Sequence, residues 1–267
     1  MVHGRPAAKN LCRGLRTLSL LIPAFNEQAR LSSLLAAISG AARAEVATAG
    51  FELVETLVID DGSRDETRRI LTAAASSELT PVLDCVEHRG KGAALRRGVL
   101  RARGDYVLLA DADLSTPISE LGKLAAAIDE GADLAIGSRA VAGAVVERGP
   151  LHRKLTGMTF SATVRVLTGL EVRDTQNGFK LLGTATARSL FAEQLCPGFG
   201  FDVELLLRAQ LVGLRIIEVP VVYIHDSRSR VKVARAGLQM FREVALLSRR
   251  LHPRSNSHTA VDRPTRG

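Results

Sequence analysis

Aromatic side chains are scarce in this sequence, which has no tryptophan, two tyrosines and an aromatic content of 4%. Proteins that bind single-stranded nucleic acid stack bases on such side chains, so we expect no stacking surface of that kind. Zinc-finger and aromatic RNA-binding motifs are also absent. The formal net charge of +8 fits nucleic acid, an anionic membrane surface and a phosphorylated substrate alike. The scarcity of aromatic side chains makes nucleic acid the least favoured of the three.

Cysteines are few and irregularly spaced, because Cys12, Cys85 and Cys196 form no CxxC pair. They predict buried thiols of a reducing compartment rather than a disulfide framework or a zinc site. The basic segment at 1–16 lacks the apolar core of a secretory signal, and no apolar run approaches the roughly 18 residues of a membrane span. We expect a soluble or peripheral membrane protein.

Several well-known site motifs are missing as well. The phosphate-binding loop GxxxxGK[ST] and the dinucleotide fingerprint GxGxxG do not occur, which argues against a P-loop NTPase and an NAD-binding enzyme. The six histidines show no HExxH spacing, and we expect His88 and His225 to be loop or surface residues.

What the chain does contain is an alternation of short β-rich runs and Ala/Leu-rich helical runs. This alternation predicts βαβ units, and hence an α/β fold with a mostly parallel central sheet and helices on both faces. The expected strands are 17–22, 53–60, 81–87, 106–111 and 132–138, and the expected helices are 27–40, 65–76, 91–103 and 118–130.

Polar clusters follow four of these strands: PAFNEQARL, DDGSRDETRRI, HRGKGAALRRG and DADLSTP. Each has an ordinary explanation when taken alone; DDGS is typical of a turn, and Asp65 of a helix N-cap. The carboxyl ends of parallel strands meet at one edge of a sheet, however, so the four clusters together predict a ligand site. Asp111 and Asp113 follow a buried strand, where unpaired carboxylates are costly, and so predict a cation against them.

In this order the clusters resemble the family 2 glycosyltransferases of the GT-A fold, and the resemblance extends over about residues 17–250. Farther along, VRDTQNGFKL, GFGFDVELL, GLRIIEVPVVY and SRVKV resemble the subgroup that transfers a hexose to polyprenyl (dolichyl) phosphate. The expected parts are a basic tail (1–16), a GT-A domain (17–227, with a nucleotide-sugar half at about 17–140 and an acceptor half at about 141–227), a basic helix (228–254) and a disordered tail (255–267).

The resemblance implies a nucleotide-sugar donor and a divalent cation, Mg²⁺ or Mn²⁺. Asp113 would be the direct metal ligand, with Asp111 close to the metal and the ribose. Ser115 stands where mannose-transferring members usually have glutamine, which favours glucose from UDP-glucose and leaves the metal shell open. The remaining residues of the implied nucleotide pocket are Pro23, Phe25, Glu27, Asp60, Asp61 and Lys91.

On the acceptor side the resemblance implies phosphate contacts from Arg139 and Arg153. A lipid monophosphate is already anionic near pH 7, because its second pKa is about 6, so no general base is required. If the acceptor were a sugar or metabolite hydroxyl, a general base would be required, and Asp202 and Asp174 would be the candidates. Alternatively, Asp202 has a structural role and caps the helix that we expect to begin there.

The stretch at 228–254 holds eight Lys and Arg residues and a single acidic one. Apolar residues recur in it at helical spacing, which predicts a basic amphipathic helix lying on an anionic membrane surface. The alternative is a helix that packs back on the domain. The apolar positions are Val231, Ala234, Leu238, Phe241, Ala245, Leu246 and Leu247.

We therefore expect an inverting hexosyltransferase that acts on polyprenyl phosphate, peripheral on the cytoplasmic face of the membrane. Two alternatives stay open: a soluble GT-A enzyme that glycosylates a hydroxyl, and a non-catalytic basic protein that binds nucleic acid or membrane.

Overall fold

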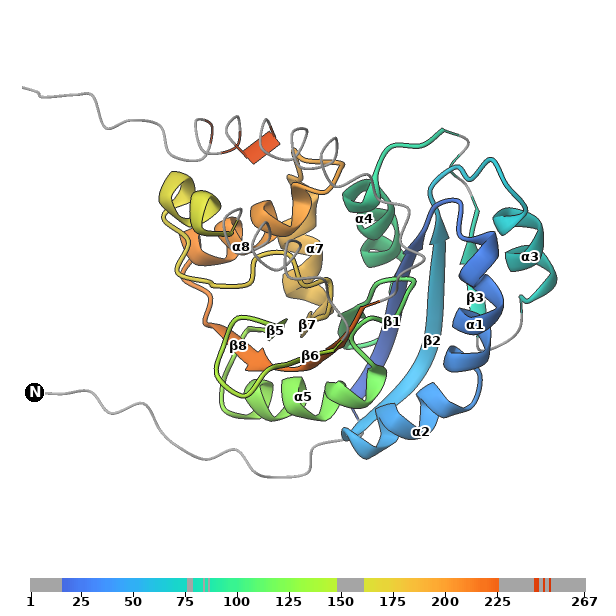
Figure 1. Cartoon of the computed structure of the whole chain (residues 1–267), viewed down its shortest axis with the longest axis horizontal. Helices are drawn as coiled ribbons and strands as arrows, with labels where there is room; N and C mark the ends of the chain where they lie inside the picture. Colours follow the sequence, from blue (N-terminus) through green and yellow to red (C-terminus); the bar gives the residue numbers. More distant parts are fainter. Residues whose placement is uncertain are drawn as a thin grey trace, which may run out of the picture.

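A seven-stranded sheet forms the centre of the molecule in the computed structural model (Figure 1). The structure describes residues 16–75, 79–83, 85, 87–147, 161–225, 243–244, 247 and 250. The strand order is β3-β2-β1-β4-β7-β5-β8. The bounds are β1 Arg16–Ala24, β2 Phe51–Asp60, β3 Leu79–Val82, β4 Tyr106–Leu109, β5 Leu134–Ser138, β7 Lys180–Gly183 and β8 Ile216–Pro220.

All neighbouring strands pair in parallel except β7, which is antiparallel to both β4 and β5. The mostly parallel α/β fold is therefore confirmed. Strands β7 and β8 come from the second half of the chain and complete the same sheet as the first half. A separate two-stranded parallel sheet pairs β6 (Val145–Glu147) with β9 (Val222–Ile224).

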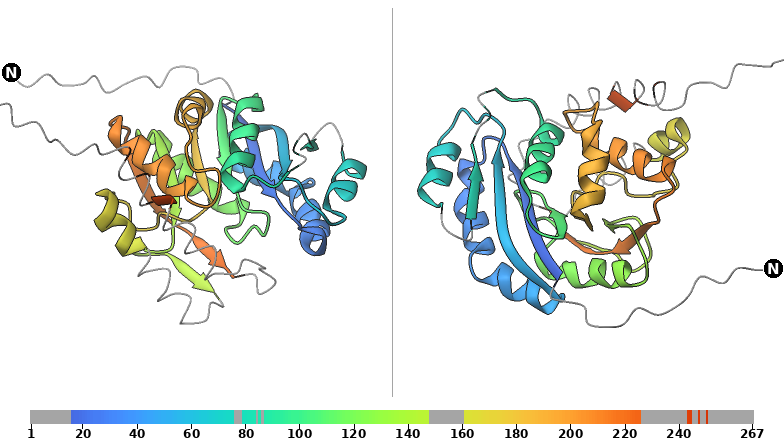
Figure 2. Two further views of the ribbon diagram at one scale, coloured as in Figure 1. Left: turned by 90° about the horizontal axis from the view of Figure 1, so that it is seen from above. Right: turned by 180° about the vertical axis from the view of Figure 1, so that it is seen from behind.

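Helices cover both faces of the sheet (Figures 1 and 2). One face carries α4 (Lys91–Arg101), α7 (Thr184–Ala192) and α8 (Phe201–Leu211). The other carries α1 (Gln28–Ile38), α2 (Ala41–Thr48), α3 (Thr67–Ala73) and α5 (Leu121–Asp129), the last preceded by the 3₁₀ turn η1 (Ile118–Glu120). A further helical segment spans 161–168.

Strand β1 shows why its sequence is an almost unbroken apolar run. Leu18, Leu20 and Ile22 pack into the core beneath α1, α2 and α5, while Leu21 packs into the core beneath α4, α7 and α8. Successive side chains of a strand point to opposite faces, so a strand with helices on both sides must be apolar at nearly every position.

Strand β3 is shorter than expected, because 81–87 was expected and the strand ends at Val82. It is an edge strand that contains Pro81, a position where the missing N–H costs no ladder hydrogen bond. Beyond it the chain turns toward Asp61, whose carboxylate accepts hydrogen bonds from the backbone N–H groups of Arg89 and Gly90. These bonds take the chain out of the sheet.

Two described residues of the C-terminal stretch, Val244 and Leu247, are buried in the core beneath α8. At these positions the chain packs on the domain, which is the alternative to a membrane-surface helix, and Leu247 is not presented to a membrane. Most of the other residues of 228–254, and all of the tails at 1–15 and 255–267, lie outside the described residues. Among the residues that are described, no helix is both long and apolar enough to cross a membrane.

Candidate functional site

The candidate site lies at the carboxyl ends of β1, β2, β4 and β5 (Figure 1). Three of the four polar clusters of the sequence follow β1, β2 and β4, and the fourth, HRGKG, leads from β3 into α4. This edge carries Pro23 at the end of β1, followed by Phe25 and Glu27; Asp60 at the end of β2, followed by Asp61; Asp111 and Asp113 after β4; and Arg139 after β5. Two helices contribute their first turns, which hold Lys91 in α4 and Asp202 in α8. Arg153 lies outside the described residues.

Lys91 is the cation that lies against Asp111. Its Nζ is 2.6 Å from Oδ1 of Asp111 and 3.8 Å from Oδ2 of Asp202. Burial would lower the pKa of Lys91, but the two carboxylates raise it above its usual value. The ammonium is therefore charged at every physiological pH.

Behind this pair, Lys180 of β7 is completely buried and donates a hydrogen bond to Oδ1 of Asp202. Asp111, Lys91, Asp202 and Lys180 thus form a line of alternating charges. Asp202 makes no side-chain cap for α8, so its expected role as a helix cap is not seen. Both carboxylate oxygens of Asp202 thus face an ammonium group, Oδ1 that of Lys180 and Oδ2 that of Lys91.

The loop before β7 lies against one side of the Asp111 carboxylate, which is partly exposed. A Cβ at Gly178 would lie 2.5 Å from Oδ2 of Asp111, so any larger residue at this position would displace the carboxylate. Burial would raise the pKa of Asp111, but Lys91 foremost, with Lys180 and Arg139, holds it below its usual range. Asp111 is therefore an anion whose charge is balanced by protein cations.

Asp113 lies in a more negatively charged environment than Asp111. Burial raises its pKa above the usual value, and the Asp111 carboxylate raises it further. Its Oδ1 accepts a hydrogen bond from the backbone N–H of Ser115 at 3.0 Å, and its Oδ2 is 3.8 Å from Nη1 of Arg30. Arg30 also pairs with Glu27 at 2.6 Å, and so connects the carboxylates after β1 and β4.

Two residues with left-handed backbone conformation lie on this edge of the sheet: Asn26 with φ 55° and Leu114 with φ 46°. For a side chain like leucine this conformation costs about 1–2 kcal/mol. Leu114 stands between Asp113 and Ser115, and its N–H donates to the carbonyl of Asp111 at 3.0 Å. This strained turn orients the two aspartates, and such strain is typical of ligand sites.

Asp61 anchors the loop that leads into α4. Its buried carboxylate accepts hydrogen bonds from the backbone N–H of Gly90 at 2.6 Å and of Arg89 at 3.3 Å, and lies 2.7 Å from Nδ1 of His88. Asp60 is also buried, and its carboxylate accepts from the N–H of Ser63 at 3.2 Å.

Phe25 and His88 form a stack at the same edge, with ring centres 3.8 Å apart and planes inclined by 19°. The histidine is a loop residue, as expected, but it also lies face to face with a residue of the implied nucleotide pocket. The stack lies beside the Asp61 carboxylate, which is buried and is also paired with Arg97 at 3.4 Å.

Arg139 makes a two-pronged ion pair with Asp174. Its Nε and Nη2 lie 2.7 and 2.8 Å from the two carboxylate oxygens, and its guanidinium lies 4.8 Å from the centre of the Tyr223 ring. Burial would raise the pKa of Asp174, but Arg139 holds it below its usual value. Asp174 is thus a poor general base, and Nη1 of Arg139 is the nitrogen that this pair does not use.

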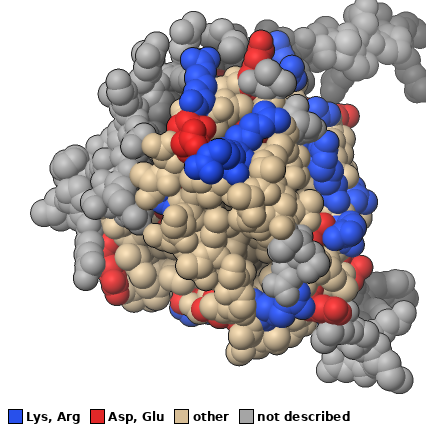
Figure 3. All heavy atoms as spheres, turned by 90° about the vertical axis from the view of Figure 1, so that its right-hand side faces the viewer, with Lys and Arg blue, Asp and Glu red and all other residues tan. Residues whose placement is uncertain are grey.

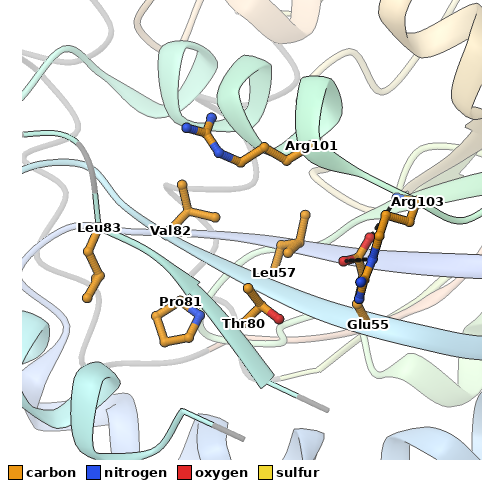
Figure 4. Close-up of a pocket in the computed structure, with 8 residues that line it drawn as sticks. All are labelled: Glu55, Leu57, Thr80, Pro81, Val82, Leu83, Arg101 and Arg103. Carbon is orange, nitrogen blue, oxygen red and sulfur yellow. Dashed lines mark hydrogen bonds and ion pairs between the residues drawn. The ribbon is translucent and has the colours of Figure 1, made fainter. Parts of the chain in front are cut away.

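A hollow of about 360 Å³ lies elsewhere, between β2, β3 and the end of α4 (Figure 4). Leu57 and Val82 line it, and Arg101 and Arg103 stand at its side. The Arg103 guanidinium pairs with the buried Glu55 carboxylate at 2.9 Å. No residue of the candidate site lines this hollow, so we treat the two as separate.

The face on the α3 and β3 side is shown in Figure 3. Lys and Arg side chains lie at the top, along the right-hand edge and at the bottom of this view, acidic side chains lie beside several of them, and an uncharged area occupies the middle. The described part of this face therefore presents separate basic groups rather than one continuous basic surface.

The residues after β4 fit a divalent cation. Asp113 offers a carboxylate held by a strained turn, whereas Asp111 is paired with Lys91 at 2.6 Å and would have to share its oxygens between the ammonium and the metal. Among the described residues no group of three or more His, Cys, Asp or Glu side chains gathers to hold a metal on its own. Two carboxylates are nevertheless the number that Mg²⁺ or Mn²⁺ needs when a diphosphate supplies the other oxygen ligands.

Comparison with known families decides the assignment. The family model described as Glycosyl transferase family 2 matches residues 19–188, a segment that includes the strands and loops of the aspartate-rich edge. The chain belongs to this family. It is a glycosyltransferase, as the resemblance implied.

Relatives of this family 2 glycosyltransferase include proteins named dolichyl-phosphate beta-glucosyltransferase. The Drosophila melanogaster protein is 34% identical over 243 residues, which cover 86% of this chain and 74% of that protein. The Dictyostelium discoideum protein is 33% identical over 237 residues, with coverages of 85% and 72%. The Homo sapiens protein is 30% identical over 243 residues, with coverages of 87% and 75%.

Solved structures similar to this glycosyltransferase include glucosyl-3-phosphoglycerate synthase from Mycobacterium tuberculosis. Its complex with UDP has a TM-score of 0.62 at 22% identity, covering 87% of this chain and 80% of that one. Its complex with Mn²⁺, UDP-glucose and phosphoglyceric acid has a TM-score of 0.63 at 21% identity, with the same coverages. At this identity the similarity shows the fold, which is GT-A as expected.

The sequence analysis did not identify three residues that the structure brings into the candidate site. Arg30 follows Glu27 at the i+3 spacing of a helical ion pair, a signal that was present in the sequence. His88 was assigned only a loop position. Lys180, in NGFK, gave no signal, because its burial depends on β7 entering the sheet between β4 and β5.

Proposed function

We propose that this glycosyltransferase transfers glucose from UDP-glucose to a polyprenyl phosphate of the dolichyl phosphate class, with inversion at the anomeric carbon. The names of the relatives with 30–34% identity support the acceptor class and the β-linked product. Because the donor carries glucose in α linkage, a β-linked product requires inversion. We further propose that the enzyme works as a peripheral protein on the cytoplasmic face of the membrane.

The observation that carries the proposal is the pair of aspartates after β4 with Lys91 against them. Asp111 and Asp113 would hold Mg²⁺ or Mn²⁺, which when bound neutralises charge on the leaving diphosphate. The Lys91 ammonium, on the first turn of α4, would contact the same diphosphate. These charges meet the leaving group where its negative charge develops.

The uracil base would lie beside Phe25, His88 and Asp61, together with Pro23 and Asp60. The Phe25 ring would supply an apolar face, and the Asp61 oxygen that now lies 2.7 Å from His88 would become the acceptor for a ring N–H. Insertion of the base would require His88 to leave its stacking position on Phe25. Glu27 would stay at the edge of this pocket, held by Arg30.

The acceptor phosphate would bind near Arg139 and Arg153, with Nη1 of Arg139 free of the Asp174 pair. One of its anionic oxygens attacks the anomeric carbon from the side opposite to UDP. A carbon–oxygen bond to the acceptor forms as the bond to UDP breaks, and the electron pair leaves on the diphosphate. No proton has to be removed, which fits the two candidate bases, Asp174 and Asp202, both held in ion pairs.

Purified enzyme should be assayed with UDP-glucose, Mn²⁺ and a short-chain polyprenyl phosphate, and the product examined by NMR. The expected result is a β-glucosyl phosphate, with no product from the corresponding polyprenol, which lacks the phosphate. The proposal fails if the free alcohol or a sugar hydroxyl is the better acceptor, or if the product keeps the α configuration. If transfer to polyprenyl phosphate occurs with GDP-mannose but not with UDP-glucose, the proposed donor is wrong and the proposed acceptor stands.

A further inference from the structure

The C-terminal stretch reaches the candidate site through Glu243, its single acidic residue. Oε2 of Glu243 accepts a hydrogen bond from the backbone N–H of Gly200 at 2.9 Å. Val244 and Leu247, on the same stretch, are buried in the core that also contains Phe201. The Glu243 carboxylate is therefore held against the domain, at the point where α8 begins.

Gly200 is suited to this contact because it has no side chain. A Cβ on Gly200 would lie 2.6 Å from Oε2 of Glu243 and 3.0 Å from its Cβ, while Cys196 would be at an ordinary 3.5 Å. The φ of Gly200 is −66°, which any residue adopts. The approach of Glu243, and not the backbone conformation, is what requires glycine here.

The two residues that follow Gly200 contact Lys91. Gly200 is the N-cap of α8, and Phe201 and Asp202 are the first two residues of that helix. Nζ of Lys91 lies 5.3 Å from the centre of the Phe201 ring and 3.8 Å from the Asp202 carboxylate. The position of the α8 N-terminus thus determines two of the surfaces that surround the ammonium.

The loop before this N-cap also holds the backbone beside Lys91. The carbonyl of Pro197 accepts from the N–H of Ala93 at 2.9 Å, and the carbonyl of Gly198 accepts from the N–H of Gly92 at 3.3 Å. Both donors belong to the first turn of α4. The segment at 197–202 therefore contacts both the backbone that follows Lys91 and the Lys91 ammonium.

We infer that Glu243 is a positioning residue: by fixing Gly200 it holds Phe201 and Asp202 in the arrangement that directs Lys91 at the donor diphosphate. The inference rests on the proposed function, which gives the diphosphate to Lys91. It assigns to the C-terminal stretch a part in donor turnover, in addition to any contact with the membrane.

The test is a comparison of Glu243→Ala and Glu243→Gln in wild-type and Lys91→Met backgrounds, with a detergent-dispersed short-chain acceptor. Loss of a hydrogen bond to a charged group lowers kcat by about tenfold or more in Glu243→Ala, with the acceptor KM within about twofold. Glu243→Gln keeps an acceptor oxygen and restores most of the rate. In the Lys91→Met background, Glu243→Ala causes no further loss, because the residue it acts through is gone.

Gly200→Ala perturbs the same contact from the other side and should give the same kinetic pattern. Glu193→Gln is the matched control, because Glu193 is an exposed carboxylate close to the start of α8 in sequence and makes no contact with Gly200 among the described interactions. Hydrogen exchange supplies a readout that needs no substrate. The amides at 92–93 should exchange faster in Glu243→Ala than in the wild-type protein, and at the wild-type rate in Glu193→Gln.

An equal loss from Glu243→Ala in both backgrounds, or unchanged exchange at 92–93, would overturn the inference. If Lys91→Met itself kept the wild-type rate, the role of Lys91 in the proposed function would be wrong, and the inference would fall with it. If Glu243→Ala speeds exchange at 92–93 while Lys91→Met keeps the wild-type rate, the structural link from Glu243 to α4 exists and only the role of Lys91 in the proposed function is wrong.

Discussion

The Lys91 ammonium lies 2.6 Å from the Asp111 carboxylate and 3.8 Å from the carboxylate of Asp202, which is paired with the buried Lys180. The cation that the sequence required beside Asp111 is thus supplied by the protein itself. A divalent cation with a bound diphosphate would compete with Lys91 for the same carboxylate oxygens and give the ammonium new negative groups to contact.

Asp113→Asn is expected to lower kcat by roughly 100-fold or more and to make the remaining rate insensitive to chelator, because a metal ligand is removed from the leaving-group side. The melting temperature should change by no more than about 2 °C, since Asp113 lies at the edge of the sheet and outside the core. Glu52→Gln, an exposed change at the opposite end of β2, is the control. Full activity in the presence of EDTA would contradict the metal assignment.

Arg139→Ala and Arg153→Ala should each raise the acceptor KM or lower kcat by about 10- to 100-fold, which corresponds to a lost charge-assisted hydrogen bond. Affinity for UDP-glucose, measured by calorimetry, should change little. Arg139→Lys is expected to behave like alanine at this position, because lysine cannot make the two-pronged pair with Asp174. Arg69→Ala, an exposed change on α3, should have no effect. Weaker UDP-glucose binding would move these arginines to the donor side.

Lys180→Met should destabilise the protein by about 3–5 kcal/mol, because it leaves the Asp202 carboxylate buried without its closest partner. Adding Asp202→Asn should recover about 1–3 kcal/mol, since the uncompensated charge is then removed. Urea unfolding followed by circular dichroism measures both values; fluorescence is unsuitable because the chain has no tryptophan. Strict additivity of the two changes would show that the pair is not coupled.

Asp174→Asn should cost about 2 kcal/mol at pH 7, less than for a fully buried pair because Arg139 is partly exposed. The folded-state pKa of Asp174 lies below its ordinary value of 3.8, so its contribution is present above that value and lost as pH falls through the folded pKa. The stability gap between the two proteins should therefore narrow from about pH 5 downward. A gap that is constant or widens toward low pH would contradict the depressed pKa.

Membrane binding by residues 228–254 is best tested with charge changes, because deletion would also remove Val244 and Leu247 from the core. Replacing the basic residues by glutamine should weaken sedimentation with anionic vesicles, at about 1 kcal/mol for each charge near the surface. Binding of the unchanged protein should fall as salt rises, since the Debye length is about 8 Å at physiological ionic strength. Equal binding to neutral and anionic vesicles would remove the electrostatic explanation.

The first half of the fold followed from the sequence because its signals are local. Apolar runs such as 17–22 mark strands buried on both faces, and the polar residues after them mark one edge of a parallel sheet. The expected helix at 91–103 appears as α4, Lys91–Arg101. Asp65, expected as an N-cap, lies one residue before the assigned cap of α3, and its carboxylate accepts from the N–H of Thr67 at 3.0 Å.

The rest depended on contacts between distant segments. The strand at 180–183 is only four residues long and was not identified, and nothing local shows that it enters the sheet antiparallel to its neighbours. Lys180 is buried only because of that insertion. The Arg139–Asp174 pair joins residues 35 apart in the sequence, and the sequence analysis gave them separate roles, a phosphate contact and a candidate base, because nothing local shows that they are partners.

The insertion of β7 between β4 and β5 has a consequence for folding order. Hydrogen-bonded neighbours there are separated by about 45 to 75 positions along the chain, so the centre of the sheet cannot close until residue 183 has been synthesised. Such non-local pairing slows folding and exposes strand edges in the meantime. We therefore expect a nascent chain that ends near residue 140 to hold β4 and β5 with unpaired edges. During synthesis that intermediate would be the form most prone to aggregate and most dependent on chaperones.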